Sequence, residues 1–180
     1  TNNIIKSVTI KTNKITTKLT AQRYIFTAGS NNAMLTTELP AAPPMQLRPL
    51  QMVIAKSNNL PTLYGHCIGL GTVPRITITT HFAHDKTPVW YLGGKLAEEG
   101  VSRDAVEQIA TAKQELIALF PRIDFSTTKF ASFYVDRAEA KQSNGSKPNS
   151  ITVFNKNNYI TAWPTKLAFA PLLAQQILDC

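Results

Sequence analysis

The residues best suited to chemistry lie close to the C-terminal end of the sequence. An apolar, strand-like run over residues 158–162 meets a tight corner, Trp163-Pro164-Thr165-Lys166, and an apolar segment then predicts a helix over residues 167–178. The start of a helix leaves backbone N–H groups without partners and therefore favours an anion or a dipole. An ordinary strand-to-helix turn that packs a terminal helix onto a sheet explains the same pattern.

Three arginines could bind a carboxylate, because the planar guanidinium donates to both oxygens. Arg48 and Arg75 lie at the starts of strand-like runs, and Arg137 follows another such run. The segment Asp136-Arg137-Ala138-Glu139 could equally form an internal salt-bridge cluster.

Histidines and aromatic residues supply further candidates. His66 and His81 lie at polar positions on or beside predicted strands and could transfer protons, although a hydrogen-bonded structural histidine also explains each of them. Tyr91 and Trp163 combine an apolar body with a polar group, which suits either a core or a substrate contact. We therefore keep His66, His81 and Arg137 as catalytic candidates, and Arg48, Arg75, Arg137 and Tyr91 as substrate-binding candidates.

Several other kinds of chemistry have little support. His81, His84 and Asp85 could ligate a metal, but no Cys-x-x-Cys or His-Glu-x-x-His motif accompanies them, so no metal is predicted. No Gly-x-Ser-x-Gly elbow supports nucleophilic hydrolysis. Gly69-Leu70-Gly71 lacks the third glycine and the following helix of a dinucleotide-binding fingerprint.

Length and composition indicate one domain with a real core, or a large domain that lacks a part. The 180 residues are 43% hydrophobic, and no apolar run is long enough to span a membrane. The start, Thr1-Asn2-Asn3, shows no secretory signal and no initiator Met, so we expect a processed chain or an excised piece. Cys67 and Cys180 do not form a disulfide framework, which predicts a cytoplasmic protein.

The net charge of +8 permits binding of nucleic acid or an acidic ligand. The basic residues are dispersed, however, and the lysine-rich opening carries them about four residues apart, at Lys6, Lys11, Lys14 and Lys18, without interleaved aromatics. A solvated basic face is the simpler interpretation. A non-enzymatic basic module that binds nucleic acid or an acidic partner stays the alternative function, and a scaffold that pairs through exposed strand edges is a third.

Periodicity predicts an α+β chain. Strands are expected over residues 5–10, 15–19, 21–29, 45–55, 63–68, 75–81, 89–92, 130–135, 151–154 and 159–162, and helices over residues 33–39, 103–120 and 167–178. The middle connections are too short for helical crossovers, so the sheet should be largely antiparallel. Tyr24, Ile25 and Phe26 predict a strand covered on both faces. Ser102 is expected to cap the long helix, Asp104 to lie in its first turn, and Val106 to lie on its apolar face.

This order of parts, with a strand that ends in Thr27-Ala28-Gly29 and a final strand-corner-helix, resembles the second half of a D-amino-acid oxidase/glycine oxidase type FAD-dependent oxidoreductase. The resemblance covers essentially all 180 residues as an order of elements. It implies an antiparallel substrate domain over residues 40–150 with one long packed helix. Residues 1–39 and 151–180 would be returning strands and the terminal helix of a Rossmann-like FAD-binding domain.

The resemblance also implies a cofactor and its contacts. FAD would lie against Ala28, Gly29, Trp163, Thr165, Lys166 and Leu167, and a small amine, amino acid or hydroxy acid would be oxidised by hydride transfer to the flavin. The chain departs from the family in lacking G-x-G-x-x-G and in having Trp-Pro-Thr-Lys where the family commonly has glycines. We therefore expect the partner to be a missing N-terminal FAD-binding segment, and these residues alone to be inactive. The substrate is a small molecule, no transmembrane segment is expected, and a homo-oligomer is possible.

Overall fold

The computed structural model describes residues 4–37, 39, 44–71 and 73–180, and the chain divides into two compact units. The first unit combines Thr1–Arg48 with Arg137–Cys180, and we call it the flanking unit. The second unit, the central unit, is Pro49–Asp136. Each unit is described by itself below.

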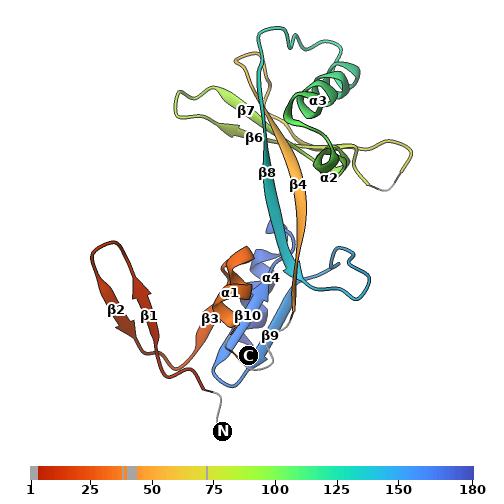
Figure 1. Cartoon of the computed structure of the whole chain (residues 1–180). Helices are drawn as coiled ribbons and strands as arrows, with labels where there is room; N and C mark the ends of the chain where they lie inside the picture. The colour runs from red at the N-terminus through yellow and green to blue at the C-terminus, as the bar shows by residue number, and fades with distance from the viewer. Residues whose placement is uncertain (1–3, 38, 40–43, 72) are drawn as a thin grey trace. The chain divides into compact units, whose positions relative to one another are not determined.

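The flanking unit is built on a three-stranded sheet in the order β3, β10, β9. These strands are β3 (Tyr24–Phe26), β10 (Tyr159–Trp163) and β9 (Thr152–Lys156), and β10 runs parallel to β3 and antiparallel to β9. Helix α4 (Ala170–Leu178) follows β10 and packs Leu173 against Ile160 and Ala162 on one face of that strand (Figure 1). The predicted hairpin that leads into a terminal helix is confirmed.

The opening of the flanking unit is a two-stranded hairpin. Strands β1 (Val8–Lys11) and β2 (Thr16–Leu19) pair antiparallel, as the alternation predicts. Its base is tied to the turn between β9 and β10, because the Asn158 side chain accepts from the Ile5 amide at 2.9 Å and donates to the Ile5 carbonyl at 2.8 Å.

Strand β3 differs from its prediction. Tyr24 is buried, but Ile25 is 50% exposed, so the expectation that both faces are covered is wrong. Ile25 points to the face opposite that of Tyr24, and this face is left open around it in the described part of the chain. A 3-10 turn, η1 (Gly29–Asn31), and the short helix α1 (Asn32–Thr36) follow it. The predicted helix over residues 33–39 is therefore shorter and begins earlier, and residues 40–43 of the proline-rich segment lie outside the described residues.

The central unit carries most of a five-stranded sheet. The order is β5 (Tyr64–Cys67), β6 (Ile76–Phe82), β7 (Pro88–Gly93), β4 (Met45–Lys56) and β8 (Lys129–Ala140). The β5–β6, β6–β7 and β7–β4 pairs are antiparallel, which confirms the prediction from short connections. The α+β fold class is likewise confirmed.

Helix α3 (Ala105–Leu119) covers one face of this sheet and buries Ala112 and Leu116 in a core with Trp90 and Leu92 (Figure 1). Before it come α2 (Lys95–Glu99) and the 3-10 turn η2 (Gly100–Ser102), which the sequence did not predict. The cap is Asp104 rather than Ser102, because the Asp104 carboxylate accepts from the Glu107 amide at 2.8 Å.

The apolar face of α3 was also predicted incorrectly at its start. Val106 is 78% exposed, whereas Gln108 is fully buried. The Gln108 amide donates to the Gln51 and Leu96 carbonyls at 2.9 and 3.0 Å. A polar residue therefore faces inward here, because two backbone carbonyls need donors.

Strand β8 is longer than predicted. The expectation was a strand over residues 130–135 with Asp136 to Glu139 leaving its end, but the strand continues to Ala140. Its neighbour β4 is also twelve residues long and offers a partner along its length. Arg137 therefore lies within a strand and not after one. Among the helices that the structure describes, none is long and apolar enough to cross a membrane.

Candidate functional site

The corner after β10 is held in an uncommon backbone conformation. Thr165 has φ of 60°, and the Lys166 N–H donates to the Pro164 carbonyl at 2.6 Å, which closes a tight turn. The Thr165 hydroxyl donates to the Ser150 carbonyl at 2.9 Å and so ties the corner to the loop before β9. The corner is thus fixed by bonds on both sides.

The segment after the corner corrects one expectation. A 3-10 turn, η3 (Leu167–Phe169), precedes α4, which begins at Ala170 with a proline near its first position. Pro171 suits a helix start because it has no N–H to satisfy. Of the three amides predicted to be available to a ligand, that of Lys166 is already used, whereas those of Thr165 and Leu167 make no hydrogen bond within the described part of the chain.

Two buried polar atoms on β10 have no hydrogen-bond partner among the described residues. They are the Trp163 indole Nε1 and the Thr161 hydroxyl, in residues that are 2% and 0% exposed. The two side chains lie two positions apart on the strand and therefore share one face of it. Buried polar groups are nearly always paired, but these two atoms are covered by the protein itself, so a ligand could reach them only if the side chains over them moved.

The Ala28-Gly29 turn lies beside the same strand. The buried Asn32 side chain accepts from the Ala28 amide at 2.7 Å and donates to the Ala162 carbonyl at 3.3 Å. Gly29 has φ of 60°, and both Ala28 and Gly29 are exposed. Five of the six candidate cofactor contacts thus lie near β10: Trp163 is on the strand, Thr165 and Lys166 are in the corner after it, and Ala28 and Gly29 follow its parallel neighbour β3. The sixth, Leu167, follows in the next turn. The sequence reading missed Asn32, for which the signal was only a polar residue at the start of a short helix.

The candidate arginines of the flanking unit have different surroundings. The Arg48 guanidinium donates to the carboxylate of Glu139, which is fully buried, at 3.1 to 3.2 Å, and the Gln46 amide donates to the same carboxylate at 3.3 Å. Arg48 is therefore part of an internal salt bridge. Arg137 is half-buried and makes no ion pair or hydrogen bond with the described residues, so its guanidinium is available.

A further cation near these residues was not predicted as a site residue. Lys147 is half-buried, and burial lowers its pKa, as do the positive charges of Arg137, Lys166 and Arg48, while Glu139 opposes the change. The loop that carries it reads as exposed in the sequence because it is rich in glycine, serine and asparagine. Nothing in that pattern could have located this lysine.

In the central unit, the sheet face opposite α3 carries an aromatic row. The rings of His81 and Tyr91 meet edge to face at a centroid distance of 4.6 Å, and those of Tyr91 and Phe133 at 6.3 Å. The strand register places Tyr64, Thr79, Tyr91 and Ile54 side by side across four strands, and His66 pairs with Thr77 in the next row. Tyr91, His81 and His66 therefore share one open face, as side chains spaced two apart on paired strands must.

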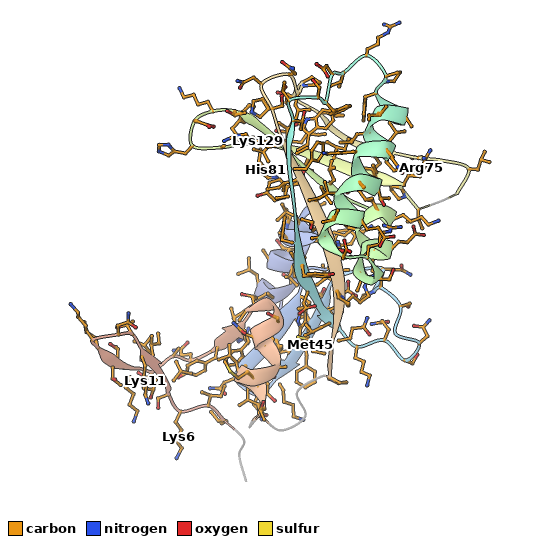
Figure 2. The ribbon with its side chains drawn as sticks, turned by 45° about the horizontal axis from the view of Figure 1, so that its top comes forward. Lys6, Lys11, Met45, Arg75, His81 and Lys129 are labelled. Carbon is orange, nitrogen blue, oxygen red and sulfur yellow. The ribbon has the colours of Figure 1, made fainter. Side chains whose placement is uncertain are left out.

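Arg75 belongs to a different part of the central unit. Figure 2 labels Arg75 and His81 at opposite ends of β6. The Arg75 guanidinium donates to Glu115 on α3 at 2.6 Å. It also lines a hollow of about 590 Å³ between the β5–β6 loop and α2, whose other charged residues are Lys95, Glu98 and Glu99. The structure thus does not bring Arg75 together with the other candidates.

His81, His84 and Asp85 were considered above as possible metal ligands. Asp85 accepts from Lys56 at 2.7 Å and from the Thr87 amide at 3.1 Å, and these hydrogen bonds lower its pKa to about 2. No cluster of three His, Cys, Asp or Glu suited to a metal occurs in the described ranges.

Comparison with known proteins shows which kind of enzyme this chain is similar to. No protein-family model matches it. Over 162 residues, the chain is 46% identical to a probable FAD-dependent oxidoreductase, PA4991, of Pseudomonas aeruginosa, a match that covers 89% of this chain and 41% of the relative. The crystal structure of the FAD-dependent oxidoreductase PA4991 superposes with a TM-score of 0.81 at 46% identity, over 89% of this chain and 45% of that one.

These matches show that the chain shares its fold with part of an FAD-dependent oxidoreductase. The chain spans less than half the length of the relatives that it matches. The likeness to the D-amino-acid oxidase/glycine oxidase subtype goes beyond what the names of these relatives state.

Proposed function

We propose that these 180 residues are part of an FAD-dependent oxidoreductase that oxidises a small amine, amino acid or hydroxy acid. The observation that carries the proposal is the 46% identity and shared fold with PA4991 along 89% of the chain. Because the chain has no G-x-G-x-x-G motif, the part that binds the pyrophosphate would lie in sequence outside these residues. In this proposal residues 1–39 and 151–180 hold the returning elements of the FAD-binding domain, and residues 40–150, which include the central unit, form the substrate domain.

The donors around the corner fit a flavin ring, which presents carbonyl oxygens and ring nitrogens as acceptors. The Thr165 and Leu167 amides make no hydrogen bond within the described residues. FAD would supply the hydride acceptor, with negative charge collecting on its ring upon reduction. Lys166 and these amides would stabilise that charge, since donors fixed in place act without reorganisation.

A carboxylate of the substrate would be bound by a residue of the flanking unit. Arg137 would bind a carboxylate, because it is half-buried and no described carboxylate occupies it. Tyr91, His66 and His81, on the open face of the central unit, remain the sequence-based candidates for packing against a ligand and for proton transfer. Arg48 and Arg75 are weaker candidates, because Glu139 and Glu115 already pair with them.

The proposal is tested by reading the coding sequence that adjoins these residues and purifying the protein that all of it encodes. We expect a strand followed by G-x-G-x-x-G, a yellow protein, and released flavin that co-elutes with FAD. Anaerobic bleaching of the flavin by a panel of amines, amino acids and hydroxy acids then identifies the substrate class.

Site variants sharpen this test. Replacing Arg137 with Met should raise the KM for a carboxylate substrate at least about tenfold, since a charge-assisted pair is worth about 1.5 to 3 kcal/mol. The exposed residue Lys141, on the loop after β8, provides the matched control as Lys141→Met. A colourless protein with no adjoining fingerprint would contradict the function, and an unchanged KM would remove Arg137 from the site.

A further inference from the structure

The flanking unit contains a group of positive charges that the described residues do not neutralise. Arg137 and Lys147 are half-buried and Lys166 is exposed, and none of the three forms an ion pair with a described carboxylate. The Lys166 ammonium lies over the Phe169 ring at 5.4 Å from its centroid. The carboxylate that interacts with this group, Glu139, already accepts from Arg48 and Gln46.

Specific bonds hold the three cations in one neighbourhood. Arg137 and Glu139 are two residues apart on β8 and share a face of it. The Gln46 side chain accepts from the Gln142 amide at 3.1 Å and donates to the Ser146 carbonyl at 2.8 Å, which fixes the loop just before Lys147. The Thr165 hydroxyl donates to the carbonyl of Ser150 at the end of the same loop, and Thr165 is the residue before Lys166. Lys147 thus lies between two ties, one to Gln46, which also donates to Glu139 on β8, and one to Thr165, which precedes Lys166.

The electrostatics of Lys147 agree with this arrangement. Burial lowers its pKa first, and the charges of Arg137, Lys166 and Arg48 lower it further. The three neighbouring cations therefore repel the Lys147 ammonium, and the single carboxylate of Glu139 does not offset that repulsion. Half-buried like charges are costly when they are held together, and an anion placed among them would relieve both the repulsion and the poor solvation.

We infer that Arg137, Lys147 and Lys166 form a site for a small ligand with two negative charges, with Lys147 as the residue that sets this preference. Arg48 and Glu139 neutralise each other, which leaves three charges from these cations. A single carboxylate would still leave two of them unopposed, whereas a dianion leaves one. Lys166 could then still serve the flavin. The inference rests on the proposed function only in treating that ligand as the substrate, which would make it a dicarboxylate or a phosphate-bearing molecule.

Titration calorimetry of the purified protein at pH 7 and low salt tests the inference, with succinate, inorganic phosphate and acetate as probes. We expect succinate to bind at least about tenfold more tightly than acetate, because one more charge-assisted contact forms. Lys147→Gln should remove most of that preference and Lys147→Arg should retain it. Lys141→Gln, on the same loop, should leave it unchanged. Phosphate binding tighter than that of succinate would assign the second charge to a phosphate, and weaker phosphate binding would assign it to a second carboxylate.

The results distinguish this inference from the proposed function. Equal affinity for succinate and acetate overturns the inference even if the protein holds FAD and oxidises a monocarboxylate. A preference for succinate that survives in Lys147→Gln overturns the role of Lys147. A protein translated from the whole coding sequence that lacks flavin but prefers succinate through Lys147 keeps the inference and removes the proposed function.

Discussion

The two units treat their charged side chains in opposite ways. In the central unit the ion pairs are exposed and matched, as in Arg75 with Glu115, Lys56 with Asp85, and Lys95 with Glu99. In the flanking unit, one carboxylate is fully buried beneath Arg48, and two half-buried cations have no described carboxylate. Matched surface pairs add little to the free energy of unfolding, whereas removing one partner of a buried pair, or holding unmatched cations together, changes it by much more. Among the described residues, charge is therefore buried or left unmatched in the flanking unit and is matched at the surface in the central unit.

The sharpest test of this contrast is to remove one carboxylate from each unit. Glu139→Gln should lower the free energy of unfolding by about 3 kcal/mol, because it removes the buried carboxylate from its ion pair with the Arg48 guanidinium, whose side chain is 22% exposed. Glu115→Gln should cost less than about 1 kcal/mol, because both side chains of its pair are partly exposed. Urea unfolding of the two variants measures both values. Similar losses would show that the contrast has no energetic meaning.

A second test asks whether the central unit depends on buried neutral bonds instead of charge. Gln108→Ala should cost about 2 kcal/mol, because the Gln51 and Leu96 carbonyls lose their buried donor. Gln114→Ala, at an exposed position of the same helix, is the matched control and should change stability by less than about 0.5 kcal/mol. An equal effect of the two substitutions would place Gln108 outside the packed interior.

The smallest expected effect is the pH dependence caused by Lys147. Its pKa is lowered in the folded protein, so between that pKa and the ordinary value near 10.5 the unfolded chain binds more protons, and stability rises with pH. The charged lysine is therefore unfavourable below the folded pKa. Lys147→Gln should raise the Tm slightly at pH 7, and the gain over the parent should vanish as the pH approaches 10.5.

Thermal unfolding of the parent, Lys147→Gln and Lys141→Gln at a series of pH values provides this measurement. The difference in Tm between the parent and Lys147→Gln isolates the effect of this one lysine from that of the other groups that titrate in the same pH range. A Lys147→Gln protein that melts at a lower temperature than the parent at pH 7 would show that the lysine is neutralised by a contact in the folded chain.

The local elements could be predicted from the sequence because their signals are local. The strand-like runs over residues 75–81 and 89–92, with short turns between them, predict paired antiparallel strands. The run Asn155-Lys156-Asn157-Asn158 predicts the β9–β10 hairpin, in whose turn Asn157 has φ of 52°. The inward side of α3 could not be predicted in full. The apolar spacing suggested that Val106 faces inward. Gln108 faces inward instead, because it donates to the carbonyl of Gln51 on β4, which lies far away in the sequence.

The candidate site could be predicted only in part, for the same reason. The corner at Trp163 to Lys166 is visible because an apolar strand, a proline and an apolar helix follow one another. The environments of the arginines depend on residues far away in sequence, since Arg48 and Glu139 are 91 positions apart and the Gln46 tie to Ser146 spans 100. Lys147 looked like an ordinary loop lysine because its tether and its cationic neighbours lie elsewhere in the chain.

The two tryptophans of this sequence fall one in each unit, and both are buried. Trp90 donates its indole N–H to the Pro61 carbonyl at 2.8 Å, whereas the indole N–H of Trp163 has no acceptor among the described residues. The protein therefore carries its own pair of fluorescent labels. Changing either one to Phe leaves a single emitter, so the melting of each unit, and the arrival of anything that quenches light beside the corner, can be followed separately without attaching a dye.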